Sequence, residues 1–149
     1  MKVIQVNQTA KPRASKDEKF LAGVVKKIIA ELQTKKIRNR RYLRQKKELT
    51  VVFLTPAQMK KINFQFRKKN KPTDILSFQS EDPVSLGELL LCTDVLKTQA
   101  KKQNHSLNDE TSYMLIHGIL HLLGYDHEES LLEEKLMFKI QDQCFNNLI

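Results

Sequence analysis

The apolar residues of the chain follow two periods, one typical of strands and one typical of helices. Short runs rich in branched and aromatic side chains, such as residues 49–54, have the length and composition of buried strands. Longer segments repeat apolar residues every three to four positions, which places those residues on one face of a helix. The expected strands cover residues 1–7, 49–54, 74–78 and 87–92. The expected helices cover residues 15–32, 56–67, 95–102, 107–124 and 129–145.

Local signals support several helix boundaries. Ser15 and Glu18 have the spacing of a capping box, and Thr55 followed by Pro56 can cap and begin the second helix. Gly124 tolerates the left-handed conformation that ends a helix. Strands and helices mixed within 149 residues predict one domain with an α/β (mixed α+β) fold, in which about five helices cover a mostly parallel sheet of about four strands.

Composition excludes several classes of protein. Hydrophobic residues make up 40% and charged residues 29% of the chain, with four Gly and four Pro, which argues against collagen-like, low-complexity and wholly disordered proteins. No apolar run approaches the ~18 residues of a membrane span, and residues 1–10 lack the apolar core of a secretory signal. We therefore expect a cytoplasmic protein without a membrane partner. Cys92 and Cys144 fit neither a disulfide framework nor a C-x-x-C motif, and we expect both to be reduced packing residues.

The charge is unevenly distributed. Residues 1–104 hold 24 Lys and Arg against 9 Asp and Glu, whereas residues 105–149 hold 2 against 8. A strongly cationic surface favours polyanions, with nucleic acid the first candidate and an anionic membrane surface the second. Eight of the thirteen residues at 35–47 are Lys or Arg. Such a run is either a solvated connector or a direct contact to phosphates, and the sequence leaves both readings open.

Three of the four histidines lie within eleven residues of one another. His117 and His121 are four positions apart on an expected helix, so their rings leave the same face. A turn at Gly124 can bring His127 back toward the same point. Three imidazole nitrogens leave the fourth position of a tetrahedral Zn²⁺ open for water, which is typical of a catalytic zinc site. Any single histidine is more often a hydrogen-bonded surface or core residue, but the combined spacing favours metal binding.

The same spacing resembles the metal helix of the zincin fold, in particular the metzincin pattern H-E-x-x-H-x-x-G-x-x-H. Gly118 stands where that pattern has its catalytic Glu. Because glycine cannot accept a proton, the usual peptidase mechanism is not expected here. The sequence therefore predicts a metal site of the same layout with different chemistry.

Two motifs resemble a known family, the YbeY endoribonucleases, also described as rRNA maturation factors. Residues 117–127 match the family signature H-G-x-x-H-L-x-G-Y-D-H throughout. Residues 63–67 and 71–78 are similar to its N-x-x-x-R and P-T-D-V-L-S-F segment. The chain departs from the family at Gln79, where Pro is usual, and at residues 86–89, where L-G-D-I is usual. Both departures lie outside the expected metal shell.

The resemblance implies a single zinc ion on His117, His121 and His127 and single-strand endoribonuclease activity. The implied role is maturation of the 3′ end of small-subunit (16S) ribosomal RNA and ribosome quality control. Ribosomal RNA and the small ribosomal subunit are the implied partners, with ribosomal proteins or assembly factors as further candidates. Arg67 matches a functional arginine of the family, and its planar guanidinium suits a phosphate. Pairing of Arg67 with Asp74, or capping of its own helix, is the structural alternative.

Several further assignments follow from residue type alone. The candidate RNA contacts are basic residues of two segments: Arg38, Arg40, Arg41, Arg44, Lys68, Lys69 and Lys71. Asp126 can orient an imidazole or close a turn, and His105 is expected to be a surface residue. Two other functions stay open, namely a metallopeptidase or other zinc hydrolase that draws its base from Glu128 or Glu129, and a non-catalytic ribosome-binding module with structural zinc.

Overall fold

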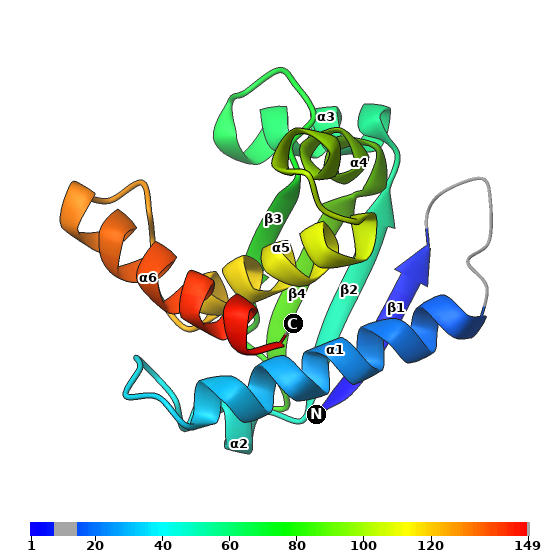
Figure 1. The fold of residues 1–149 in the computed structure, drawn as a ribbon. Coiled ribbons are helices and arrows are strands. Elements are labelled where there is room, and N and C mark those ends of the chain that lie inside the picture. Colours follow the sequence, from blue (N-terminus) through cyan, green and yellow to red (C-terminus); the bar gives the residue numbers. More distant parts are fainter. Residues whose placement is uncertain (8–14, 149) are drawn as a thin grey trace.

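A four-stranded sheet forms the centre of the molecule, with strand order β1-β2-β4-β3 (Figure 1). The computed structural model describes residues 1–7 and 15–148, without the side chains of residues 7 and 15–18. Strands β1 (Lys2–Asn7), β2 (Glu48–Leu54) and β4 (Ser85–Cys92) are parallel to one another, and β3 (Ile75–Gln79) pairs antiparallel with β4 at one edge. The predicted mixed α/β fold with a mostly parallel sheet is therefore confirmed.

The long helices match the expected segments closely. They are α1 (Ser15–Gln33), α3 (Pro56–Arg67), α4 (Thr93–Gln103), α5 (Leu107–Leu122) and α6 (Leu131–Leu148). The last one begins two residues later than expected, because Asp126 and Ser130 organise turns before it. A further helix of four residues, α2 (Tyr42–Gln45), lies inside the basic segment, residues 35–47. It is too short to show an apolar period from which it could be predicted. The capping box expected at Ser15 and Glu18 lies outside the described side chains, whereas Thr55 and Gln58 form one at α3.

Both faces of the sheet are covered, which explains the continuous apolar character of β2. Leu49, Val51 and Phe53 face the core beneath α1, α5 and α6, and the alternate residues Val52 and Leu54 face the smaller core beneath α3. None of the described helices is long and apolar enough to span a bilayer.

Helix α5 lies very close to the sheet at Gly118. A Cβ added there would be 2.7 Å from Ile75 Cδ1 and 2.7 Å from Leu89 Cδ2, both on buried side chains of β3 and β4. Only glycine fits this approach without displacing its neighbours. The close contact fixes the height of α5 above the sheet and, with it, the position of the histidines on either side of Gly118.

Candidate metal centre

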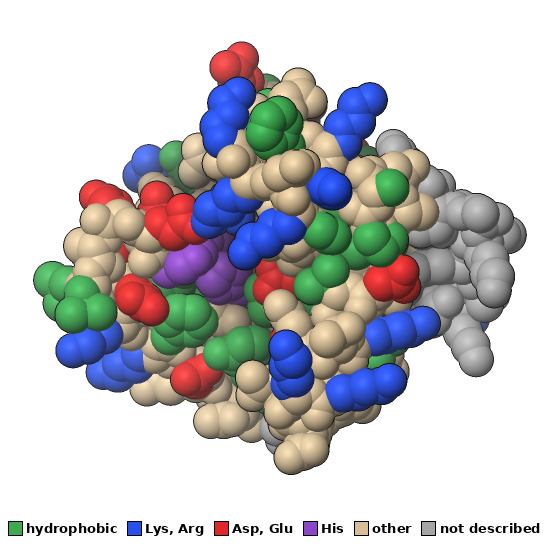
Figure 2. Space-filling model, turned by 90° about the horizontal axis from the view of Figure 1, so that it is seen from above, with side chains coloured by type: hydrophobic (Ala, Val, Ile, Leu, Met, Phe, Trp, Pro, Cys, Tyr) green, Lys and Arg blue, Asp and Glu red, His purple; other side chains and the backbone are tan. Residues whose placement is uncertain are grey.

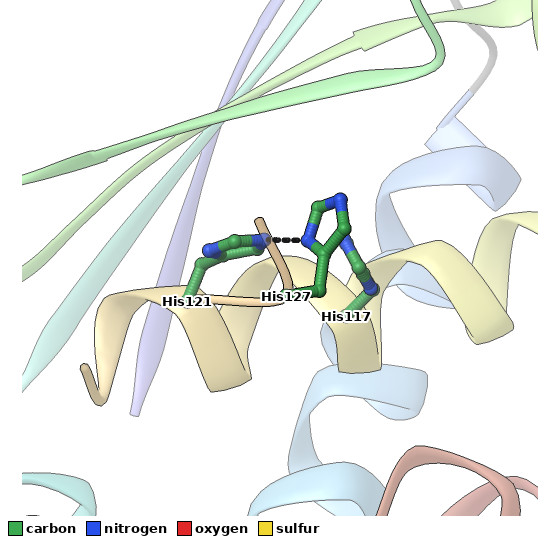
Figure 3. Close-up of side chains that lie close together, drawn as sticks. All are labelled: His117, His121 and His127. Carbon is green, nitrogen blue, oxygen red and sulfur yellow. Dashed lines mark hydrogen bonds between the residues drawn. The ribbon is translucent and has the colours of Figure 1, made fainter. Parts of the chain in front are cut away.

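Three imidazole rings converge at the C-terminal end of α5 (Figure 3). One ring nitrogen from each of His117, His121 and His127 lies within 4.8 Å of the others. The shortest separation joins His121 Nε2 and His127 Nδ1 at 3.1 Å. Tetrahedral zinc with bonds of 2.0–2.1 Å places its ligand nitrogens about 3.3 Å apart. The described residues therefore include a donor group that could hold one metal ion, with imidazole as its only ligand type.

The third histidine reaches this point because the chain reverses directly after α5. Gly124 has φ +104°, a conformation that side chains rarely adopt, and its N–H donates to His121 O at 3.0 Å. Asp126 Oδ1 then accepts a hydrogen bond from Glu128 N at 2.9 Å, so Asp126 closes a turn rather than orienting an imidazole. The turn expected from Gly124 is confirmed.

The same loop is held from the distant basic segment. The Arg38 guanidinium pairs with Glu133, donates to Gly124 O at 3.3 Å and lies 4.6 Å from the centroid of the Tyr125 ring. Asn39 Nδ2 donates to Leu123 O at 2.9 Å. Residues 38 and 39 therefore clamp both sides of the turn that carries His127 toward α5.

A buried glutamine of α6 fixes the orientation and tautomer of His117. Gln141 is fully buried; its Nε2 donates to Tyr113 O at 3.2 Å, and its Oε1 lies 2.9 Å from His117 Nδ1. Because the Tyr113 carbonyl can only accept, the amide nitrogen of Gln141 must face it, which leaves Oε1 as the acceptor toward His117. His117 Nδ1 therefore carries the proton, and its Nε2 keeps a lone pair for a metal.

Burial favours the neutral form of His117 and His121. Burial, followed by the nearby His117 and His127, lowers the pKa of His121 to about 4. Burial also lowers the pKa of His117, against the opposing effect of its hydrogen bond to Gln141. Neutral imidazole is the form that binds metal, so this desolvation prepares the donors at neutral pH. The donor set fits a zinc ion.

A cleft of about 440 Å³ opens over the histidines and is bordered by cations on its other side. Arg67, at the end of α3, forms an ion pair with Glu128, and Lys69 Nζ lies 3.7 Å from the same carboxylate. Glu128 Oε1 is in turn 3.9 Å from His127 Nε2. Figure 2 shows this arrangement from above, with histidines beside a group of Lys and Arg side chains. Arg67 therefore lies at the cleft with the histidines, and its carboxylate partner is Glu128 rather than Asp74.

The loop after α3 takes its shape from buried polar contacts. Asn63 is fully buried and donates from Nδ2 to Lys71 O at 2.8 Å, while Lys68 adopts a left-handed φ of 59° at the helix end. Asp74 accepts hydrogen bonds from Ile75 N at 2.7 Å and from Gln99 Nε2 at 3.1 Å, which hold its carboxylate at the start of β3. These contacts place the cations of residues 67–71 along the cleft.

The other candidate residues fall outside the histidine cluster. Arg40, Arg41 and Arg44 line a separate surface cavity with Lys36, and Arg38 is engaged with Glu133. His105 pairs with the buried Glu110 and contacts the ring of Phe145, so it belongs to the packing between α5 and α6 and is only partly exposed. Cys92 and Cys144 are buried free thiols, as expected.

Two contacts of the site were not predicted from the sequence. They are the hydrogen bond between His117 and Gln141, and the pairing of Glu128 with Arg67. The only local signal for Glu128 was its place beside a candidate ligand. For Gln141, a glutamine among the apolar positions Met137, Ile140 and Cys144 was a hint of burial.

Comparisons with known proteins agree with this geometry. The family model described as Endoribonuclease YbeY matches residues 5–149. A Bdellovibrio bacteriovorus protein named Endoribonuclease YbeY is 47% identical over 151 residues, covering 100% of this chain and 96% of the relative. A Sulfurihydrogenibium protein of the same name is 34% identical over 136 residues, covering 88% and 83%. A solution structure of a Thermotoga maritima protein matches with a TM-score of 0.59 and 26% identity, covering 96% of this chain and 86% of that one.

Proposed function

Because the chain belongs to the endoribonuclease YbeY family, we propose that it is a zinc-dependent enzyme that cuts single-stranded RNA and matures the 3′ end of small-subunit ribosomal RNA. Members of this family are rRNA maturation endoribonucleases. The observation that carries the proposal is the convergence of three imidazoles in a cleft bordered by Arg67 and Lys69. We further propose that residues 1–149 act as one domain in the cytoplasm, with a role in ribosome quality control.

His117, His121 and His127 would hold the zinc ion. When bound, zinc lowers the pKa of a water ligand toward ~7 and so supplies hydroxide at neutral pH. Gln141 keeps the His117 lone pair directed into the site. Gly118 faces the sheet and offers no proton acceptor, which is consistent with a chemistry other than that of the metzincin peptidases.

Arg67 would bind the nonbridging oxygens of the scissile phosphate. Its guanidinium already contacts a carboxylate, Glu128, in the cleft beside His127. A phosphodiester offers two nonbridging oxygens that share one negative charge, as the two oxygens of a carboxylate do. The substrate would therefore replace Glu128 as the partner of Arg67. Hydrolysis adds the water oxygen to phosphorus and breaks one P–O ester bond, and Arg67 offsets the negative charge that develops on the phosphoryl oxygens.

The two basic segments would position the RNA and the small ribosomal subunit. Lys69 and Lys71 line the cleft and Lys68 belongs to the same loop, whereas Arg40, Arg41 and Arg44 form a second cationic surface. Neutralising these last three arginines together should reduce the slope of log affinity against log salt by up to ~2 for a single strand. An unaltered slope would assign residues 40–44 to a solvated connector. Arg38 would contribute less positive charge to this surface, because its guanidinium pairs with Glu133.

The decisive experiment combines metal content with RNA cleavage. We expect the purified chain to contain one zinc per molecule, to cut single-stranded ribosomal RNA, and to stop after chelation. His121→Ala should lose zinc and cleavage while keeping its circular dichroism spectrum and RNA affinity. His105→Gln is the matched control, because His105 lies away from the cluster and glutamine can still donate to Glu110.

Three results would reject the proposal. Cleavage retained by His121→Ala would separate the activity from the histidine cluster. RNA binding without cleavage by the zinc-loaded chain would favour a binding module with structural zinc. Peptide hydrolysis by the zinc-loaded chain, with RNA left intact, would favour a metallopeptidase.

A further inference from the structure

Two aromatic side chains of α3 are unusually exposed for their size. Phe64 is 51% and Phe66 is 59% accessible, although Met59 of the same helix is fully buried. Phe66 leans on Phe78 of β3 with ring centroids 5.0 Å apart in an edge arrangement. That contact fixes the Phe66 ring while leaving more than half of the residue open to solvent. Folding therefore does not account for the exposed area of these two rings.

The segment that carries the rings holds positive charge only. Residues 56–73 contain six Lys and Arg and no Asp or Glu. Lys60 and Lys61 lie four and three positions before Phe64, on the same side of the helix, and Lys68 follows the last residue of α3. Among the described residues no carboxylate forms an ion pair with these three lysines or with Lys71. Figure 2 shows hydrophobic side chains among Lys and Arg on this face, which also displays the histidines.

This surface is continuous with the cleft. Arg67 directly follows Phe66 and lies three positions after Phe64, and its guanidinium reaches Glu128 at the histidine cluster. Lys69 and Lys71, which line the cleft, belong to the loop that follows the same helix. An RNA strand whose phosphate is bound by Arg67 would therefore run past the end of α3, where the two rings are exposed.

Exposed aromatic rings among unpaired cations are the combination that binds single-stranded nucleic acid. The cations track the phosphates, and the rings stack on bases irrespective of sequence. A lipid surface or an acidic protein would use the charge, but neither has planar bases to occupy the rings. We propose that Phe64 and Phe66, which leave the last turns of α3 on different sides, each stack on a base and together position single-stranded RNA beside the cleft. The proposal rests on the proposed function, since it assigns the nucleotides next to the cut phosphate to these rings.

The test compares an RNA oligonucleotide with a base-free strand of the same length. Binding of each is measured by fluorescence anisotropy with the full chain in chelator, so that no cleavage interferes. The double variant F64L/F66L keeps apolar packing against Phe78 and removes both rings. We expect its affinity for RNA to fall at least tenfold, with unchanged affinity for the abasic strand and an unchanged salt slope. The double variant F64W/F66W should restore RNA affinity.

Leu132→Ala is the matched control, because Leu132 is also an exposed hydrophobic residue, 79% accessible, but lies on α6 and not on α3. It should leave both affinities unchanged. Equal affinity of the wild-type chain for RNA and abasic strand would overturn the proposal, as would an equal loss for both strands in F64L/F66L. Neither result depends on cleavage, so a chain that stacks bases but does not cut RNA would refute only the proposed function.

Discussion

Gln141→Met tests whether the α6 glutamine prepares the metal centre. Methionine matches glutamine in length and fits a buried position, but it removes the acceptor of the His117 Nδ1 proton and the donor to Tyr113 O. Loss of such an outer partner typically reduces metal affinity 10- to 100-fold. At 1.4 kcal/mol per factor of ten, this corresponds to about 1.4–2.8 kcal/mol of zinc binding. Leaving buried polar groups without a partner should also cost about 1–3 kcal/mol of folding stability.

Zinc affinity is measured by competition with a chromophoric chelator, and the tautomer of His117 by long-range ¹H–¹⁵N NMR of the metal-free chain. The wild-type spectrum should show the proton on Nδ1, and Gln141→Met should show a mixture of tautomers. Gln141→Glu keeps an acceptor toward His117 and should retain most of the zinc affinity. Ile140→Val lowers stability from the neighbouring core position without touching a polar contact.

If Gln141→Met binds zinc as tightly as the wild type, Gln141 does not prepare the metal centre. The same conclusion follows if Ile140→Val weakens zinc binding to the same extent, because the effect would then follow from lost stability. A wild-type His117 with its proton on Nε2 would contradict the assigned direction of the Gln141 hydrogen bond.

Further expectations concern the substrate contact, the packing, the loop and the thiols. Arg67→Ala should slow RNA cleavage by about 100-fold at unchanged zinc content, and an unaltered rate in a single-turnover assay would exclude it from the mechanism. Gly118→Ala should lower the free energy of unfolding in urea by about 1–3 kcal/mol, and equal midpoints would mean that the sheet yields to the added Cβ. Arg38→Ala should accelerate amide exchange over residues 124–133, because the ion pair with Glu133 is lost; unchanged exchange would deny the clamp. Burial raises the pKa of Cys144 to about 12, so alkylation of the native chain should be slow at neutral pH and should keep rising with pH through pH 10; a rate that levels off below pH 10 would indicate an accessible thiol of ordinary pKa.

The fold was predictable because its elements carry local signals. The apolar period fixed the long helices to within a few residues, and the uninterrupted run of β2 matched a strand covered on both faces. The shared face of His117 and His121 was also predictable, because residues four positions apart on a helix lie on the same side. The turn at Gly124 followed from the tolerance of glycine for positive φ.

The contacts that complete the site were not predictable, because they join residues far apart in the chain. Gln141 meets His117 across 24 positions and Arg38 meets Glu133 across 95. Such pairs depend on how α6 and the basic segment pack against α5, and a single sequence holds no periodic signal for that. The pairing with Asp74 that was the structural alternative for Arg67 does not form, since Glu128 approaches from beyond the turn.

The clamp formed by residues 38 and 39 ties the histidine cluster to the completion of the whole chain. By itself, α5 presents only His117 and His121. The loop that carries His127 is held by Arg38, from the first third of the sequence. The His117 ring is held by Gln141, near the C-terminus. Until α6 packs against α5, the chain can bring the three rings together but lacks the side chain that directs the His117 lone pair toward the other two rings.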